Sequence, residues 1–142
     1  MVIIMEKVTR TDLRNYIMTI LYQINVYDKN KIKYDTADVI KGVYPIDNEF
    51  IDEIVMGVIN NKKDIDAIAN RYLEDWKIDR LGNTDQAILR MAIYEMLYTD
   101  TPGVVVIDEA VRLAKLYSDD NVRKMINGVL DKIFHEGIKN EW

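Results

Sequence analysis

Apolar residues recur at intervals of three and four along most of the chain, the spacing that places them on one face of an α-helix. A long amphipathic helix is predicted first, with apolar residues from 13 to 24 at this spacing. Thr9 and Asp12, three residues apart, predict its capped N-terminus. A short helical segment is predicted over residues 36–43, and Pro45 closes it.

Two separate helices are predicted in the middle of the chain. Asp47 or Asn48 caps the first, whose apolar face covers residues 50–59. The polar run at residues 60–63 predicts a turn, and Asp64 caps the second helix. This second helix carries its apolar face as far as Trp76, which is predicted to anchor the core.

Three further segments complete the predicted set. Thr84 caps a helix that ends at the break in residues 99–103, the clearest break in the chain. Residues 104–107 are β-branched, and we expect an extended entry into the next helix there. Asp119 or Asp120 caps the last helix.

Gly128 lies inside the predicted last helix, which Gly137 is predicted to end. A glycine in a helix costs roughly 1 kcal/mol relative to alanine, so we expect another helix backbone to approach closely at this point. Asn127 beside it is either a solvated residue or a buried hydrogen-bonding group.

The pattern as a whole predicts a single all-α domain over residues 1–142, with about six or seven helices. A chain of 142 residues, of which 49% are hydrophobic, can bury a core of its own. The apolar run at residues 1–5 is too short for a secretory signal or a membrane span. We therefore expect a cytoplasmic protein with no membrane association.

Composition narrows the chemistry further. The chain has no cysteine, which excludes disulfides and thiolate metal sites, and His135 is its only histidine. No phosphate-binding or dinucleotide-binding glycine motif is present. Adjacent acids on a helix point in different directions and are better explained as caps and solvated faces. We therefore expect no catalytic residue, no metal site and no cofactor, and a protein that is not an enzyme.

The net charge of −5 argues against non-specific coating of nucleic acid, although a local basic patch remains compatible with it. Local patterns in the chain indicate a more specific relationship. They lie at Arg14, residues 21–22, Trp76, residues 80–81, 85–90 and 94–95, Pro102, residues 107–110 and 113–115, Lys124 and residues 126–131.

These patterns resemble those of the NusB family of bacterial transcription antitermination factors. The resemblance implies an all-helical fold of two small bundles and a function without catalysis. It also implies a partner, the ribosomal protein NusE, with which NusB binds the boxA RNA element. The pair joins the antitermination complex that makes RNA polymerase processive on ribosomal RNA operons.

The resemblance also assigns candidate residues. Lys7, Arg10 and Arg14 near the first helix, with Lys124 and Met125 at the start of the last, are expected to contact RNA. Arg10 and Arg14 are four residues apart and so share one helix face. Without the resemblance, both arginines would be interpreted as a solvated charged face.

Two residues fall where the family touches NusE. These are Tyr22 in the first helix and Asp85 near the start of a later one. An acid at position 85 suits a basic partner, because opposite charges speed association. The alternative interpretation of Asp85 is a plain helix-start acid.

The chain departs from the family pattern at several positions. Residues 1–16 carry three bases and two acids, a balance of +1, and Asp12 stands where the family often has a base. Met125 replaces a common aromatic and Asp108 the usual asparagine. A second hypothesis is therefore a protein-interaction module, or a homodimer, with weak RNA affinity of its own. A third, a subunit of an RNA methyltransferase, ranks last because the chain has no catalytic domain.

Overall fold

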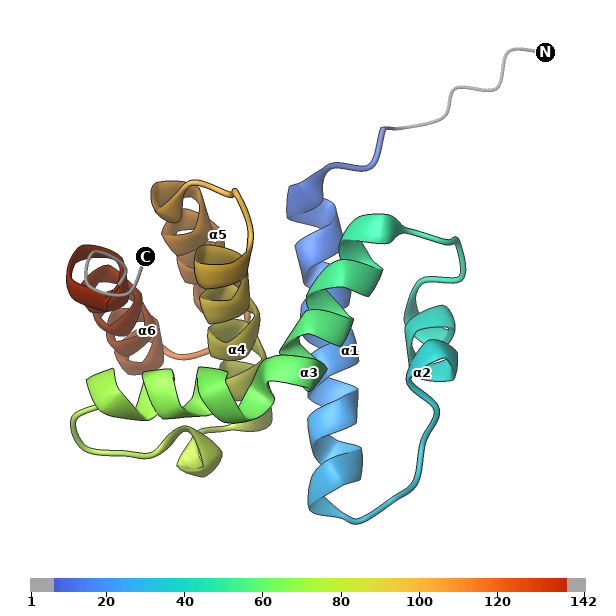
Figure 1. Ribbon diagram of the computed structural model, residues 1–142, viewed down its shortest axis with the longest axis horizontal. Helices are drawn as coiled ribbons and strands as arrows, with labels where there is room; N and C mark the ends of the chain where they lie inside the picture. Colours follow the sequence, from blue (N-terminus) through green and yellow to red (C-terminus); the bar gives the residue numbers. More distant parts are fainter. Residues whose placement is uncertain (1–6, 138–142) are drawn as a thin grey trace.

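The computed structural model describes residues 7–137, and this range contains six α-helices and no strand (Figure 1). The helices are α1 (Arg10–Lys29), α2 (Thr36–Val43), α3 (Glu49–Tyr72), α4 (Asn83–Tyr98), α5 (Gly103–Tyr117) and α6 (Asp120–Lys132). A 3-10 turn, η1 (Ile78–Arg80), precedes α4, and a π turn, η2 (Ile133–Gly137), follows α6. The all-α prediction and the approximate number of helices are confirmed.

The helices form two bundles that share one core. Helices α1 and α2 lie with the first half of α3, while α4, α5 and α6 lie together beside them (Figure 1). The second half of α3 passes along the second bundle and contacts both α4 and α6, and α1 packs along α4. Helix α4 therefore sits at the centre, against four of the five other helices. None of the described helices is both long and apolar enough to cross a membrane.

Several predicted caps are confirmed. Asp12 N donates to Thr9 Oγ1 and Thr9 N donates to Asp12 Oδ2, both at 3.1 Å, so the two residues form a reciprocal capping box. Of the two alternatives at each later start, Asn48 caps α3 and Asp119 caps α6. Each side chain satisfies a backbone N–H that has no partner within its helix.

The predicted turn at residues 60–63 is wrong, because α3 runs through it without a break. Val58 and Ile65 are buried seven residues apart, so one apolar face continues past the polar run. The polar residues occupy the opposite side, and Asn61 Nδ2 donates to a backbone carbonyl one turn earlier, at 2.8 Å. The polar run at residues 60–63 is the solvated face of one continuous helix. Asp64 lies inside this helix and does not cap it.

Other local predictions also need correction. Helix α4 begins at Asn83 after Gly82, so Thr84 lies within its first turn and does not cap it. Residues 104–107 are helical, because α5 begins directly at Gly103 after the Pro102 break. No strand or extended entry forms there. Asp108 is exposed, and nothing in its surroundings explains its departure from the family asparagine.

Trp76 is not a core anchor. Helix α3 ends at Tyr72, and the indole lies in the following loop with 60% of its surface exposed. Ile78, two residues later, is 1% exposed and takes the buried position instead. The prediction fails because it extends the helical spacing to residue 76, whereas α3 ends at Tyr72.

The predicted close approach at Gly128 is also wrong. Nothing lies within 4 Å of where a Cβ at Gly128 would stand, and Asn127 beside it is exposed. The close approach occurs at Gly57 of α3, where a Cβ would meet the Tyr94 ring. That contact lies at the α3–α4 packing interface, where the absence of a side chain lets the tyrosine fit.

A buried ion pair joins α1 to α4. Arg14 and Glu95 are 4% and 2% exposed, and Arg14 donates to both Glu95 carboxylate oxygens, through Nε at 2.9 Å and through Nη2. Glu109 of α5 lies 3.5 Å from Arg14 Nη1. Burial lowers the pKa of Arg14, but the hydrogen bonds and charges of the two carboxylates raise it by more, so the guanidinium stays charged.

A second buried arginine joins α4 to α1 and α3. Arg90 donates to both oxygens of Asp66, at 2.8 and 3.1 Å, and to Asn25 Oδ1 at 3.2 Å. Asn25 in turn donates to Gln86 Oε1 at 3.2 Å. The polar side chains buried on α4 are thus paired by the neighbouring helices, as burial requires.

Removing one partner of the Arg14–Glu95 pair should destabilise the fold strongly. Glu95→Gln leaves a buried guanidinium without its main counter-charge, so the free energy of unfolding should fall by about 3 kcal/mol or more. Urea denaturation followed by circular dichroism measures it. The double variant Arg14→Met/Glu95→Leu should recover most of the loss.

The control is the ion pair between Arg123 and Asp120 at the surface of α6. The Asp120 side chain is 83% exposed. Arg123→Gln should change stability by less than about 1 kcal/mol. An equal loss in Glu95→Gln and Arg123→Gln would show that burial does not determine the energy of the α1–α4 pair.

Candidate nucleic-acid and partner interfaces

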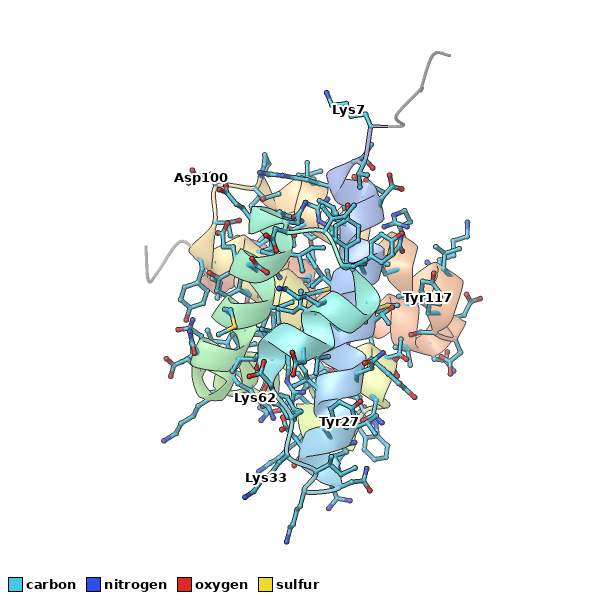
Figure 2. The ribbon with its side chains drawn as sticks, turned by 90° about the vertical axis from the view of Figure 1, so that its right-hand side faces the viewer. Lys7, Tyr27, Lys33, Lys62, Asp100 and Tyr117 are labelled. Carbon is cyan, nitrogen blue, oxygen red and sulfur yellow. The ribbon has the colours of Figure 1, made fainter. Side chains whose placement is uncertain are left out.

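Two cations stand at the N-terminal end of α1. Lys7 is exposed ahead of the helix and projects from one end of the molecule (Figure 2). Arg10 is the first residue of α1, and its guanidinium carbon lies 4.7 Å from the centre of the Phe50 ring. The stacking holds an exposed positive charge at a defined place on the surface.

Arg14 lies one turn further along the same side of α1, and its guanidinium carbon is 5.4 Å from the same Phe50 ring. Arg10 and Arg14 thus share one helix face, as their spacing predicts. Arg14 is buried against Glu95 and Glu109, so the interpretation of it as part of a solvated charged face is wrong. Its guanidinium supports the α1–α4 contact beneath Arg10.

Asp12 reduces the positive charge of this end. Hydrogen bonds from the Thr9 backbone and side chain lower the pKa of the Asp12 carboxyl, so it is ionised at neutral pH. Arg14 is neutralised by Glu95 and Glu109, which leaves Lys7 and Arg10 as exposed cations at this end. The exposed acids Asp12, Glu53 and Asp100 lie near them, the last two in the hollow that Arg10 lines. The structure gives Asp12 a capping role, which explains an acid where the family often has a base.

The second candidate RNA group lies on α6. Lys124 is exposed and Met125 is half-buried, and both line a hollow of about 380 Å³ between α6 and the loop that follows α3. We call this the Trp76 hollow, because Trp76 forms part of its wall. The residues around it are Tyr72, Leu73, Glu74, Asp75, Trp76, Asn121, Lys124, Met125, Gly128, Val129 and Lys132.

The structure does not bring the two cationic groups together. Arg10 lines a different hollow, of about 550 Å³, with Phe50, Tyr98 and the turn before α5. Thr11 Oγ1 donates to Glu109 of α5 at 2.9 Å, and α5 packs on α6. An RNA that touches both groups must therefore span the distance between two separate hollows.

The two candidate partner residues stand on adjoining helices. Tyr22 on α1 is 41% exposed. Asp85 lies half-buried in the first turn of α4, where its carboxylate accepts a hydrogen bond from Ser118 Oγ. Asn25 Nδ2 donates to Asn83 Oδ1 at 2.6 Å, one turn from Tyr22 and two residues from Asp85. This contact fixes the position of the two helices relative to one another.

Two neighbouring residues were not predicted as surface residues. Leu116 and Tyr117, in the last turn of α5 next to Ser118, are 60% and 53% exposed. Figure 2 shows Tyr117 at the edge of the molecule. Tyr117 continues the spacing of the buried Ala110 and Leu113, so helical spacing alone would place it with the core. An exposed leucine and tyrosine beside Asp85 suit a protein contact.

The NusB family model matches residues 11–135. A transcription antitermination protein NusB from Macrococcus caseolyticus is 39% identical over 133 residues, which cover 94% of this chain and 98% of that protein.

Solved structures agree with the sequence comparison. NusB from T. maritima matches with a TM-score of 0.77 and 32% identity, over 92% of this chain and 94% of that one. Antitermination factors NusB and NusE in complex with double-stranded RNA match with a TM-score of 0.73 and 27% identity, over 88% and 95% of the two chains. With its sequence and its helical arrangement both matched over most of their length, this chain belongs to the NusB family of transcription antitermination proteins.

Proposed function

We propose that this chain binds boxA RNA together with the ribosomal protein NusE, and that it thereby supports processive transcription of ribosomal RNA by RNA polymerase. It acts by binding, without catalysis and without a cofactor. The observation that carries the proposal is the match over 88% of this chain to a NusB that was solved with NusE and RNA.

The RNA-binding half of the proposal rests on exposed cations at two places. Lys7 and Arg10 at the start of α1, and Lys124 on α6, are exposed and available for phosphates. Met125 lines the hollow beside Lys124. Arg14, included among the RNA contacts by family resemblance, acts in this proposal by holding α1 in place, because its guanidinium is buried against carboxylates.

The partner-binding half rests on Tyr22 and Asp85. Asp85 offers a carboxylate whose orientation is fixed by Ser118, and Tyr22 offers an exposed ring on the adjoining helix. An acid held in place suits a basic ribosomal protein, and the net charge of −5 adds a favourable long-range field.

The alternative of a homodimer or interaction module with weak RNA affinity is not favoured. The feature that favours this alternative is the thin basic cluster at the start of α1. The related NusB structure contains both NusE and RNA, so a partner can share the binding of RNA. Weak binding by the lone chain is therefore compatible with antitermination.

The first test is RNA binding across a salt series. The mixed complex of this chain with NusE should bind a boxA-type RNA in preference to a scrambled RNA, as measured by fluorescence anisotropy. Arg10→Ala should reduce the slope of log affinity against log salt by roughly 0.7, the value for one phosphate contact on a single strand. Arg10→Lys should keep most of the slope.

The matched control is Lys33→Ala. Lys33 is exposed at the end of the molecule opposite Lys7 (Figure 2), so its removal should leave the slope unchanged. Equal affinity of the mixed complex for boxA-type and scrambled RNA would contradict the proposed function. If Arg10→Ala and Lys33→Ala changed the slope equally, the RNA would not be bound specifically at Arg10.

The second test concerns the partner. Asp85→Asn keeps an acceptor for Ser118 but removes the charge, so association with NusE should slow by up to about tenfold at low salt and converge with wild type at high salt. Stopped-flow mixing measures the rate. The control is Asp52→Asn, which removes an exposed first-turn acid from α3. If Asp52→Asn slows association as much, only net charge matters and Asp85 has no specific role.

A further inference from the structure

The fold leaves a tryptophan uncovered beside the candidate RNA residues. Trp76 is 60% exposed, although an indole is among the most favourable side chains to bury. It lines the same hollow as Lys124 and Met125, on the wall opposite α6. The sequence pattern offered no reason to connect Trp76 with the last helix, because about fifty residues separate them along the chain.

The size and the apolar lining of the Trp76 hollow suit an aromatic ring. Its volume of about 380 Å³ lies within the range of ligand pockets, roughly 300–1,000 Å³. Leu73 and Trp76 form one side, and Met125 and Val129 form part of the other. Gly128 adds no side chain to the α6 wall, and the space where its Cβ would stand is open. Gly128 is unfavourable inside a helix, but its lack of a side chain leaves the hollow open on the α6 side.

The charges around the hollow suit an uncharged base with a phosphate outside it. Lys132 Nζ lies 2.9 Å from Glu74 Oε1, and this ion pair lowers the pKa of the Glu74 carboxyl. Asp75 adds a further acid, so a phosphate would be repelled from that rim. Lys124 is exposed, and no ion pair ties it to another residue within the described range 7–137. It is the cation available at the edge of the hollow.

We propose that the Trp76 hollow receives one unstacked base of the bound RNA, which stacks on the Trp76 indole while Lys124 holds a neighbouring phosphate. This rests on the proposed function and adds a residue and a binding mode to it. Single-stranded RNA is bound by such stacking, because every base presents a π face. The proposal also explains why α6 can carry Met125 in place of the aromatic common in the family. Trp76, in the loop facing α6, supplies the aromatic ring on which a base can stack.

Affinity measurements on Trp76 variants test the proposal. In complex with NusE, Trp76→Ala should weaken binding of a single-stranded boxA-type RNA by roughly 5- to 150-fold, the cost of losing one stacked base. Trp76→Phe should keep most of the affinity. Ile46→Ala is the matched control, because Ile46 is also an exposed apolar residue, at 68%, and lines a different hollow between α2 and α3.

An abasic scan of the same RNA separates stacking from a general loss of affinity. One position should exist at which removal of the base weakens binding to wild type but has no further effect on Trp76→Ala. Gly128→Leu, which fills the hollow from α6, should reproduce the same insensitivity. Circular dichroism of each variant establishes that it is folded.

Fluorescence gives an independent readout. The chain has two tryptophans, Trp76 and Trp142, so Trp142→Phe leaves Trp76 as the only indole. RNA binding should quench its emission, and the RNA that is abasic at the coupled position should not. Unchanged affinity in Trp76→Ala, together with unquenched emission, would overturn the inference. If preference for boxA-type RNA persists in that case, the proposed function still stands and only the Trp76 site fails.

Discussion

The structure depends on the way helix α4 is buried. It packs against α1, α3, α5 and α6, so nearly every side of it is covered, yet it carries Gln86, Arg90 and Glu95 among its buried residues. Burying a charge or an amide without a partner costs several kcal/mol. Each of these side chains therefore requires a specific residue of a neighbouring helix opposite it, and this requirement fixes how the helices can be placed.

The requirement is met by α1 together with α3, whose Asp66 pairs with Arg90. Arg14 lies against Glu95 and Asn25 lies against both Arg90 and Gln86, which are contacts at two levels along the same pair of helices. A buried ion pair is weak evidence for stability but does exclude shifted arrangements, in which the charges would be unpaired. We interpret the two contacts as the device that sets the register of α1 on α4.

The proposed function depends on that register. Helix α1 presents Arg10 at its N-terminal end and Tyr22 further along, while α4 presents Asp85 beside Ser118 of α5. A single rigid pair of helices thus carries candidate residues for RNA and for the partner. Arg14 contributes by orienting α1, which explains how a residue of the family pattern can matter to binding without being exposed.

Much of this could be predicted from the sequence, because local physics decides it. The capping box at Thr9 and the break before Gly103 depend on neighbouring residues, and both were predicted. The polar run at residues 60–63 predicts a turn but lies within α3, because a solvated helix face and a turn have similar composition.

The remaining errors concern tertiary structure. Arg14 is buried because Glu95 faces it from 81 residues away, and nothing near Arg14 in the sequence indicates this. Trp76 is exposed because α3 ends before it, and Gly128 faces the open hollow between α6 and the loop after α3. The family resemblance identified the residues of the candidate site, but only the fold shows which of them are exposed.

Amide hydrogen exchange, followed by mass spectrometry, tests the central claim that separate surfaces of this scaffold bind RNA and partner. The chain would be measured alone, with NusE, and with NusE and boxA-type RNA. Addition of NusE should slow exchange at the start of α4 and the end of α5, and RNA should then slow it at residues 7–11, in the loop after α3 and at the start of α6. Protection centred instead on α2 and the turn before α3, in either complex, would contradict the account.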